Sequence, residues 1–274
     1  MEKKTYNRVL SIAGSDPSGG AGIQADIKTI SACGCFATTA IVAIVDENTL
    51  GVYGIHPVPM EFVKGQIRSV LDDIGTDSIK IGMLHSAELI RAVRSTLDLY
   101  PEITDIVLDP VMVATSGDPL LEPDAVESLK NVLIPRARVI TPNIPEAEIL
   151  LGEKIESQEN LPEMARKLSE KCSGVSVFLK AGHLSDDRLI DVFYNAETGK
   201  DLLLESPRID TVNTHGTGCT LSSAFASFLA KGLSLDEAAI ATKRYISSAI
   251  ESGAGYKIGK GHGPVDHFFN FTKK

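Results

Sequence analysis

Residues 213–225 read Asn-Thr-His-Gly-Thr-Gly-Cys-Thr-Leu-Ser-Ser-Ala-Phe, a glycine-containing turn that leads directly into small and apolar residues. This pattern predicts a tight loop followed by a helix. The first turn of a helix leaves backbone amides unpaired and carries the positive end of the helix dipole, so this junction can bind an anion such as a phosphate. Cys219 lies in that turn, where a thiol pKa can be lowered. The alternative is a structural turn in which Cys219 packs as a small hydrophobe.

Composition limits what the rest of the chain can be. Its 274 residues fit one large α/β domain spanning 1–274, and 43% hydrophobic with 23% charged residues is ordinary for a globular protein. The net charge of −9 argues against a nucleic-acid surface, and the absence of a long apolar run argues against a membrane span. Four cysteines without zinc spacing, and no signal segment, predict reduced thiols in the cytoplasm.

Strand-like and helix-like segments alternate along most of the chain. The segment 36–45 has too few polar residues to alternate, which predicts a strand covered on both faces. Segments 189–194 and 202–204 predict an antiparallel hairpin at the sheet edge. The pattern therefore predicts an α/β fold with a doubly wound, mainly parallel sheet and helices on both faces. The other predicted strands are 9–13, 78–81, 106–109, 138–140 and 175–179, and the helices are 20–34, 60–74, 89–99, 125–133, 145–151, 161–172, 217–231 and 235–253.

Polar side chains collect where these strands end, which is where ligands bind in such sheets. Asp109 and Glu146 are candidate Mg²⁺ ligands, since Mg²⁺ prefers a few carboxylates. Lys180 follows a buried strand and can reach phosphate oxygens. The alternatives are loop caps or solvated charges for the acids, and a lysine at the sheet rim for Lys180. The six histidines show no metal spacing and are interpreted mostly as loop or surface residues.

Two common nucleotide-binding signatures are missing from the sequence. There is no G-x-x-x-x-G-K-[ST], and the glycines of residues 14–22, Gly-Ser-Asp-Pro-Ser-Gly-Gly-Ala-Gly, do not match G-x-G-x-x-G. The chain is therefore predicted to be neither a Walker-type NTPase nor an ordinary dinucleotide enzyme.

Six motifs follow one another along the chain. They are residues 13–26 (Ala-Gly-Ser-Asp-Pro-Ser-Gly-Gly-Ala-Gly-Ile-Gln-Ala-Asp), 80–84 (Lys-Ile-Gly-Met-Leu), 109–112 (Asp-Pro-Val-Met), 116–121 (Ser-Gly-Asp-Pro-Leu-Leu), 141–147 (Thr-Pro-Asn-Ile-Pro-Glu-Ala) and 213–222. Together they closely resemble those of the hydroxymethylpyrimidine and phosphomethylpyrimidine kinases of thiamine biosynthesis. The resemblance runs through residues 259–265 and so covers nearly the whole chain. It implies a ribokinase-like fold, a homodimer, and Mg²⁺-ATP as the phosphoryl donor to the hydroxymethyl group of 4-amino-5-hydroxymethyl-2-methylpyrimidine. A second transfer to the monophosphate then makes the pyrophosphate.

The resemblance also implies a role for each matching residue. Cys219 takes the place of the aspartate that acts as general base in most ribokinase-like sugar kinases, and we expect it to accept the proton of the substrate hydroxyl. The anion hole is implied at Gly216, Thr217, Gly218 and Cys219; Mg²⁺ at Asp109 and Glu146; the nucleotide phosphates at Asn143 and Lys180; and the pyrimidine pocket at Gly14, Asp26, Met83 and Val111.

One position departs from the family pattern. Residues 46–49 read Asp-Glu-Asn-Thr, where the family usually has Ala-Gln-Asn-Thr with the glutamine facing the aminopyrimidine. Glutamine both accepts and donates hydrogen bonds, whereas ionised Glu47 only accepts. Either Glu47 or the ring nitrogen must carry a proton, or the substrate differs. The alternative functions are a pyridoxal or pyridoxine kinase of the same fold, and a non-catalytic ligand-sensing module.

Overall fold

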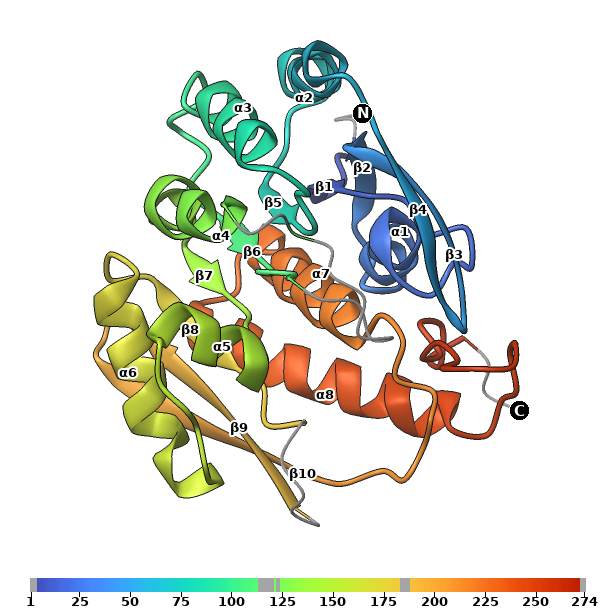
Figure 1. Ribbon diagram of the computed structural model, residues 1–274, viewed down its shortest axis with the longest axis vertical. Coiled ribbons are helices and arrows are strands. Elements are labelled where there is room, and N and C mark those ends of the chain that lie inside the picture. Colours follow the sequence, from blue (N-terminus) through green and yellow to red (C-terminus); the bar gives the residue numbers. More distant parts are fainter. Residues whose placement is uncertain (1–3, 113–120, 122–123, 183–187, 272–274) are drawn as a thin grey trace.

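The computed structural model describes residues 4–112, 121, 124–182 and 188–271, and its centre is an eight-stranded sheet. Every neighbouring pair from β2 to β8 is parallel, and β9 and β10 extend the edge as an antiparallel hairpin (Figure 1). The strands, in spatial order, are β10 (Lys200–Pro207), β9 (Arg188–Asn195), β8 (Ser176–Leu179), β7 (Val139–Ile140), β6 (Ile106–Leu108), β5 (Ser78–Ile81), β1 (Arg8–Ala13) and β2 (Phe36–Ile41).

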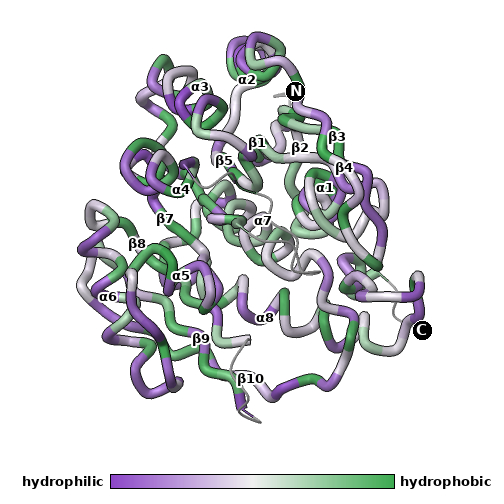
Figure 2. Tube along the Cα trace, in the orientation of Figure 1, coloured by the Kyte–Doolittle hydropathy of each residue, from purple (hydrophilic) through white to green (hydrophobic). Residues whose placement is uncertain are grey.

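Helices cover both faces of this sheet, as the sequence predicts. Successive strand residues point to opposite faces, so Val107 packs in one core while Ile106 and Leu108 pack in the other. Figure 2 shows both apolar and polar residues along α6, as expected of a helix with one buried face. The first face carries α1 (Gly22–Ala32), α7 (Thr217–Ala230) and α8 (Leu235–Gly253); the second carries α2 (Met60–Asp73), α3 (Ala87–Leu97), α4 (Ala125–Ser128), α5 (Ile144–Leu151) and α6 (Leu161–Lys171).

The prediction of one strand over 36–45 is wrong. The chain leaves the large sheet at Val42, whose amide donates to the carbonyl of Ala13, and the next residues form β3 (Ala43–Asn48). β3 pairs with β4 (Gly51–Pro57) in a separate antiparallel sheet of two strands, which lies beside α1 in Figure 1. β2 is the edge strand of the large sheet and alternates in burial, so it is not covered on both faces.

The remaining predicted elements are found with small changes in their bounds. The helix expected over 125–133 stays α-helical only to Ser128 and continues as a π-turn and a short 3₁₀ turn. Pro135 explains this ending, because it lacks an amide proton and its ring clashes with the preceding turn. Most of the motif at residues 116–121 lies outside the described residues, as does one of the six histidines, His183. Within the described ranges, no helix is both long and apolar enough to cross a bilayer.

Candidate active site

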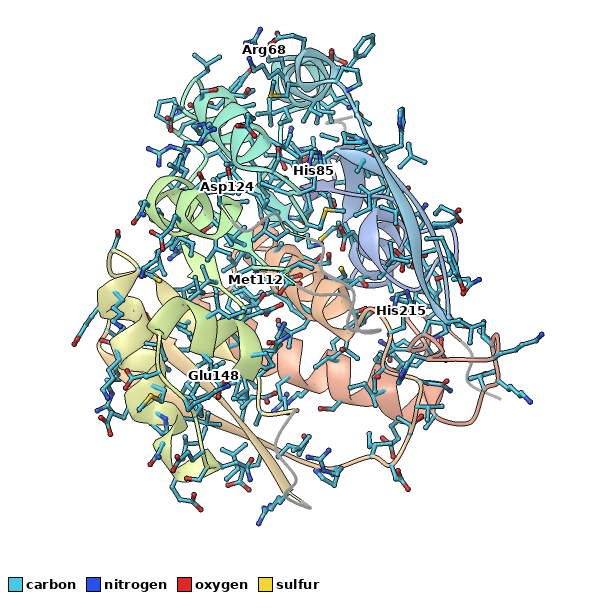
Figure 3. All side chains as sticks on the ribbon, viewed as in Figure 1. Arg68, His85, Met112, Asp124, Glu148 and His215 are labelled. Atoms are coloured by element: carbon cyan, nitrogen blue, oxygen red, sulfur yellow. The ribbon has the colours of Figure 1, made fainter. Side chains whose placement is uncertain are left out.

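A cavity of about 720 Å³ opens beyond the carboxyl ends of the parallel strands, near the point where the strand order reverses between β1 and β5. Residues that directly follow β1, β6 and β8 line it, and Met112 and His215 of its wall are labelled in Figure 3. Of the residues proposed from the sequence, the lining contains Gly14, Glu47, Met83, Asp109, Val111, Asn143, Glu146, Lys180, Gly216, Thr217, Gly218 and Cys219.

A buried pair of opposite charges, Asp109 and Lys180, follows the central strands; we call it the charged group. Lys180 Nζ donates to Asp109 Oδ1 at 3.2 Å, and the Thr141 hydroxyl donates to the same oxygen at 2.8 Å. Burial opposes the charge on Lys180, but Asp109 and Glu146 outweigh it and raise the pKa of the lysine above its usual value. Lys180 is therefore a fixed ammonium at the floor of the cavity.

Glu146 and Asn143 form the capping box of α5. The Asn143 side-chain oxygen accepts from the Glu146 amide, and a Glu146 carboxylate oxygen accepts from the Asn143 amide, both at 2.9 Å. Burial, followed by repulsion from Asp109, raises the pKa of Glu146 to about 7. Two buried carboxylates facing a single lysine leave excess negative charge and hard oxygen donors, which suits a divalent cation. Capping and ion binding are thus compatible for Glu146.

The loop before α7 makes the turn that its glycines predict. Gly216 has φ of 75° and ψ of 12°, and a Cβ at this residue would overlap the carbonyl oxygen of Gly20. Gly218 lies against the charged group, since a Cβ there would be 3.1 Å from Asp109 Oδ2 and 3.3 Å from Lys180 Nζ. The first turn of α7 therefore faces both charges. Its Thr217 amide donates to the Thr214 carbonyl at 3.3 Å, which leaves the amides of Gly216, Gly218 and Cys219 for a ligand.

Cys219 differs from the sequence prediction in its acidity. Burial raises the pKa of its thiol to about 12, and the nearby Asp26 and Asp109 add to this, although Lys80 and the Gly22 amide act in the opposite direction. The thiol pKa is therefore not lowered at this helix N-terminus, because desolvation of the thiolate outweighs Lys80 and the Gly22 amide. At neutral pH Cys219 is a neutral thiol.

Asp26 is placed behind the cavity wall instead of in it. It is fully buried, accepts from both Ser11 and Ser223, and pairs with the fully buried Lys80 at 2.8 Å. These bonds join β1, β5, α1 and α7 beneath Cys219. We therefore do not retain Asp26 as a residue that contacts the ligand, since its carboxylate oxygens are used inside the protein.

The structure adds site residues that the sequence did not single out. His215 lies in the loop before α7 but is buried, and its Nε2 lies 2.9 Å from Asp16 Oδ2 and 3.4 Å from Glu47 Oε1. Lys243 of α8 also lines the cavity and pairs with Asp191 at 2.7 Å. The sequence does carry a signal for the contact between Lys243 and Asp191, because Lys243 lies on the apolar side of the predicted helix, between Ala239 and Ile246. His267 is likewise buried, against Thr220.

Comparison with known proteins identifies the family. A family model described as phosphomethylpyrimidine kinase matches residues 16–266. This chain belongs to that family. The hydroxymethylpyrimidine/phosphomethylpyrimidine kinase of Rhizobium meliloti is 45% identical over 96% of this chain and 98% of its own length. The thiamine biosynthesis bifunctional protein ThiED of Geobacter sulfurreducens is 46% identical over 94% of this chain, which spans only 52% of that longer relative.

Solved structures of the family's relatives share the fold. The pyridoxal kinase of Bacillus subtilis in complex with ADP superposes with a TM-score of 0.88 at 34% identity, covering 98% of this chain and 100% of that one. The phosphomethylpyrimidine kinase of Clostridium difficile gives 0.76 at 40% identity, covering 89% of this chain and 99% of that one. The predicted ribokinase-like α/β fold is confirmed, and the ADP complex supports ATP as the nucleotide of this family member.

Proposed function

We propose that this protein transfers the γ-phosphoryl group of ATP to the hydroxymethyl group of 4-amino-5-hydroxymethyl-2-methylpyrimidine, and then phosphorylates the monophosphate. The observation that carries the proposal is the position of Gly218, where an added Cβ would lie 3.1 Å from Asp109 Oδ2 and 3.3 Å from Lys180 Nζ. Helix amides, an ammonium and carboxylates thus converge on one point of the cavity. Such convergence is what a phosphoryl group in transit requires.

Each part of this group has a distinct task. The amides of Gly216, Gly218 and Cys219 bind and stabilise the equatorial oxygens of the transferring group, and Lys180 neutralises negative charge on the nucleotide side. Asn143 has its side-chain oxygen engaged as a helix cap, so its amide nitrogen is the group that donates to phosphate. Asp109 and Glu146 would hold Mg²⁺, which supplies charge neutralisation between phosphate oxygens when bound.

Cys219 has the position of the general base. Because its pKa is about 12, its sulfur is protonated at neutral pH and accepts a proton only after losing its own. We therefore assign most of the rate enhancement to positioning and electrostatics, which dominate phosphoryl transfer. The base contributes the remaining part, and the amides of the same turn act without any change in protonation.

The pyrimidine is proposed to bind between the apolar wall and β3. A Cβ on Gly14 would lie 2.8 Å from the Met83 methyl group and displace it, and Val45 lies on the same side. Val111 and Glu47 complete the lining proposed for this end. A flat heteroaromatic ring matches a slot of one glycine and apolar side chains, with one polar group to orient it.

A second candidate is a pyridoxal kinase, which the TM-score of 0.88 with the Bacillus subtilis enzyme favours. The decisive experiment incubates the protein with Mg²⁺-ATP and, separately, hydroxymethylpyrimidine, pyridoxine and pyridoxal, and identifies products by mass spectrometry. Mono- and diphosphate of the pyrimidine are expected. Phosphorylation of pyridoxal alone would support the second candidate, and no ADP release with any acceptor would favour a non-catalytic ligand-sensing module.

We also propose that the protein is a cytoplasmic homodimer. The four cysteines are free thiols, which suits a reducing compartment. Exposed apolar side chains on β3, β4 and α2, among them Ile44, Tyr53 and Phe62, offer a surface for self-association. Sedimentation equilibrium of the purified protein tests the dimer, since a mass near twice 29.3 kDa is expected.

A further inference from the structure

Three titratable side chains meet at the end of the cavity next to β3. Asp16 comes from the loop after β1, Glu47 from β3, and His215 from the loop before α7, and all three line the cavity. We call them the acid–histidine cluster. His215 Nε2 lies between the two carboxylates, 2.9 Å from Asp16 and 3.4 Å from Glu47. The shorter distance is that of a charge-assisted hydrogen bond, and the longer one is not.

Asp16 is the permanently ionised member of the cluster. Its carboxylate accepts from the amides of Ser18, Gly20 and Ala21 as well as from His215, at 2.6 to 2.9 Å. Burial opposes ionisation, but the hydrogen bonds from His215, Ser18 and Ala21 outweigh it and hold the pKa of Asp16 well below its usual range. With this many donors, Asp16 has no need of a ligand to satisfy its charge.

Glu47 is the member of the cluster that lacks such compensation. Its side chain is 12% exposed, and His215 Nε2 lies within hydrogen-bonding distance of Asp16 but farther from Glu47. Burial, and then the charge of Asp16, raise the pKa of Glu47 to about 7, against the attraction of His215. A carboxyl group in this state can gain or lose a proton when a ligand arrives.

The other charged groups around Glu47 do not alter this balance. Its strand partner Val52, on β4, is apolar. The loop after α8 reaches β3 through backbone bonds from Lys260 and Gly261 to Thr49, and the Lys260 side chain is exposed. Among the residues that the structure describes, the titratable groups that face Glu47 are therefore Asp16 and His215.

We propose that Glu47 selects a ring that presents a nitrogen beside an amino-bearing carbon, by sharing one proton with that nitrogen. One carboxyl oxygen accepts from the amino group, and the other joins the ring nitrogen through a proton taken from solvent. The same pairing forms whether the proton lies on oxygen or on nitrogen. This inference rests on the proposed function. It makes Glu47 the residue that distinguishes an aminopyrimidine from a ring without an amino group, such as pyridoxal.

Calorimetry tests the proposal by counting protons. The purified protein is titrated with hydroxymethylpyrimidine at pH 8 in phosphate and in Tris, whose different ionisation enthalpies reveal proton uptake. Wild type is expected to take up about one proton per ligand, and its affinity is expected to fall toward tenfold per pH unit above pH 8. Glu47→Gln, which accepts and donates without a proton, is expected to take up none and to bind with a pH-independent affinity.

Two controls make the result specific. Asp46→Asn changes the exposed neighbouring acid on β3 and is expected to keep the wild-type proton count. An analogue with C–H in place of that ring nitrogen is expected to bind wild type about 10- to 100-fold more weakly, with no proton uptake. Proton uptake that persists in Glu47→Gln, or equal binding of the analogue, overturns the proposal. Failure of the pyrimidine to bind also overturns it, whereas proton-linked binding without phosphorylation overturns only the proposed function.

Discussion

Gly218→Ala separates the stability of α7 from the function proposed for its first turn. Gly218 is helical and does not require positive φ, so alanine suits its backbone. Replacing this glycine with alanine stabilises the helix by up to about 1 kcal/mol. The added methyl group, however, would lie 3.1 Å from Asp109 Oδ2 and 3.3 Å from Lys180 Nζ. It occupies the space where we place the phosphoryl oxygens.

The expected loss of activity follows from the number of interactions displaced. Shielding one preorganised donor from a developing charge costs about 2.7 to 4 kcal/mol, or 10²- to 10³-fold in kcat. Coupled measurement of ADP release with hydroxymethylpyrimidine gives kcat, and thermal unfolding gives Tm. We expect the fall in kcat to be accompanied by an unchanged or higher Tm.

Gly65→Ala is the matched control for this prediction. Gly65 lies in the middle of α2, and a Cβ there would meet nothing within 4 Å. This variant should gain about 1 kcal/mol in stability, or roughly 2 to 4 °C in Tm, with wild-type kcat. A Gly218→Ala enzyme that folds normally and retains activity within about threefold of wild type would refute the placement of phosphoryl transfer at this turn.

Three further predictions concern other members of the site. Asp109→Asn should lower kcat about 10²- to 10³-fold and raise the Mg²⁺ concentration needed for half-maximal rate, as a Mg²⁺ titration at fixed ATP would show. Cys219→Ala should lower kcat, and the rise of about tenfold per pH unit that a thiolate base predicts for wild type between pH 7 and 10 should disappear; a flat wild-type profile would exclude the thiolate as base. Glu47→Gln should unfold at higher urea concentration than wild type at pH 8 but not at pH 4. The reason is that a carboxyl whose pKa rises from 4.5 to about 7 on folding loses stability, about 1 to 3 kcal/mol, as pH rises through that window.

Most of the fold was predictable because hydrophobic periodicity reports directly on burial. The helix over 60–74 and the strand at 78–81 were found almost to the residue, since their apolar positions repeat with the period of the element. The break at Val42 was not predictable, because residues on both sides of it are equally apolar. The pairing of β3 with β4 decides where the chain leaves the large sheet, and the apolar pattern does not report that choice of partner strand.

The location of the candidate site was predictable for a related reason. Residues such as Asp109 and Lys180 follow buried strands, and parallel strands end at one edge. Electrostatic environment was not predictable, since it depends on how deeply each group lies and what surrounds it. The Cys219 thiol is desolvated although it lies at a helix N-terminus. Asp26 forms an ion pair with Lys80, and His215 is held by Asp16, almost two hundred residues earlier in the chain.

Because β3 and β4 form a separate sheet, the specificity for the acceptor can change while the residues of phosphoryl transfer stay the same. Glu47 lies on a hairpin that pairs with none of the eight strands carrying Asp109 and Lys180, and its side chain meets the loop before α7 at His215. Pyridoxal and pyrimidine kinases at 34% and 40% identity to this chain share its overall architecture. We therefore regard residues 43–57 as an exchangeable module: transplanting the corresponding hairpin from a pyridoxal kinase is the most economical route to a new acceptor specificity on this scaffold.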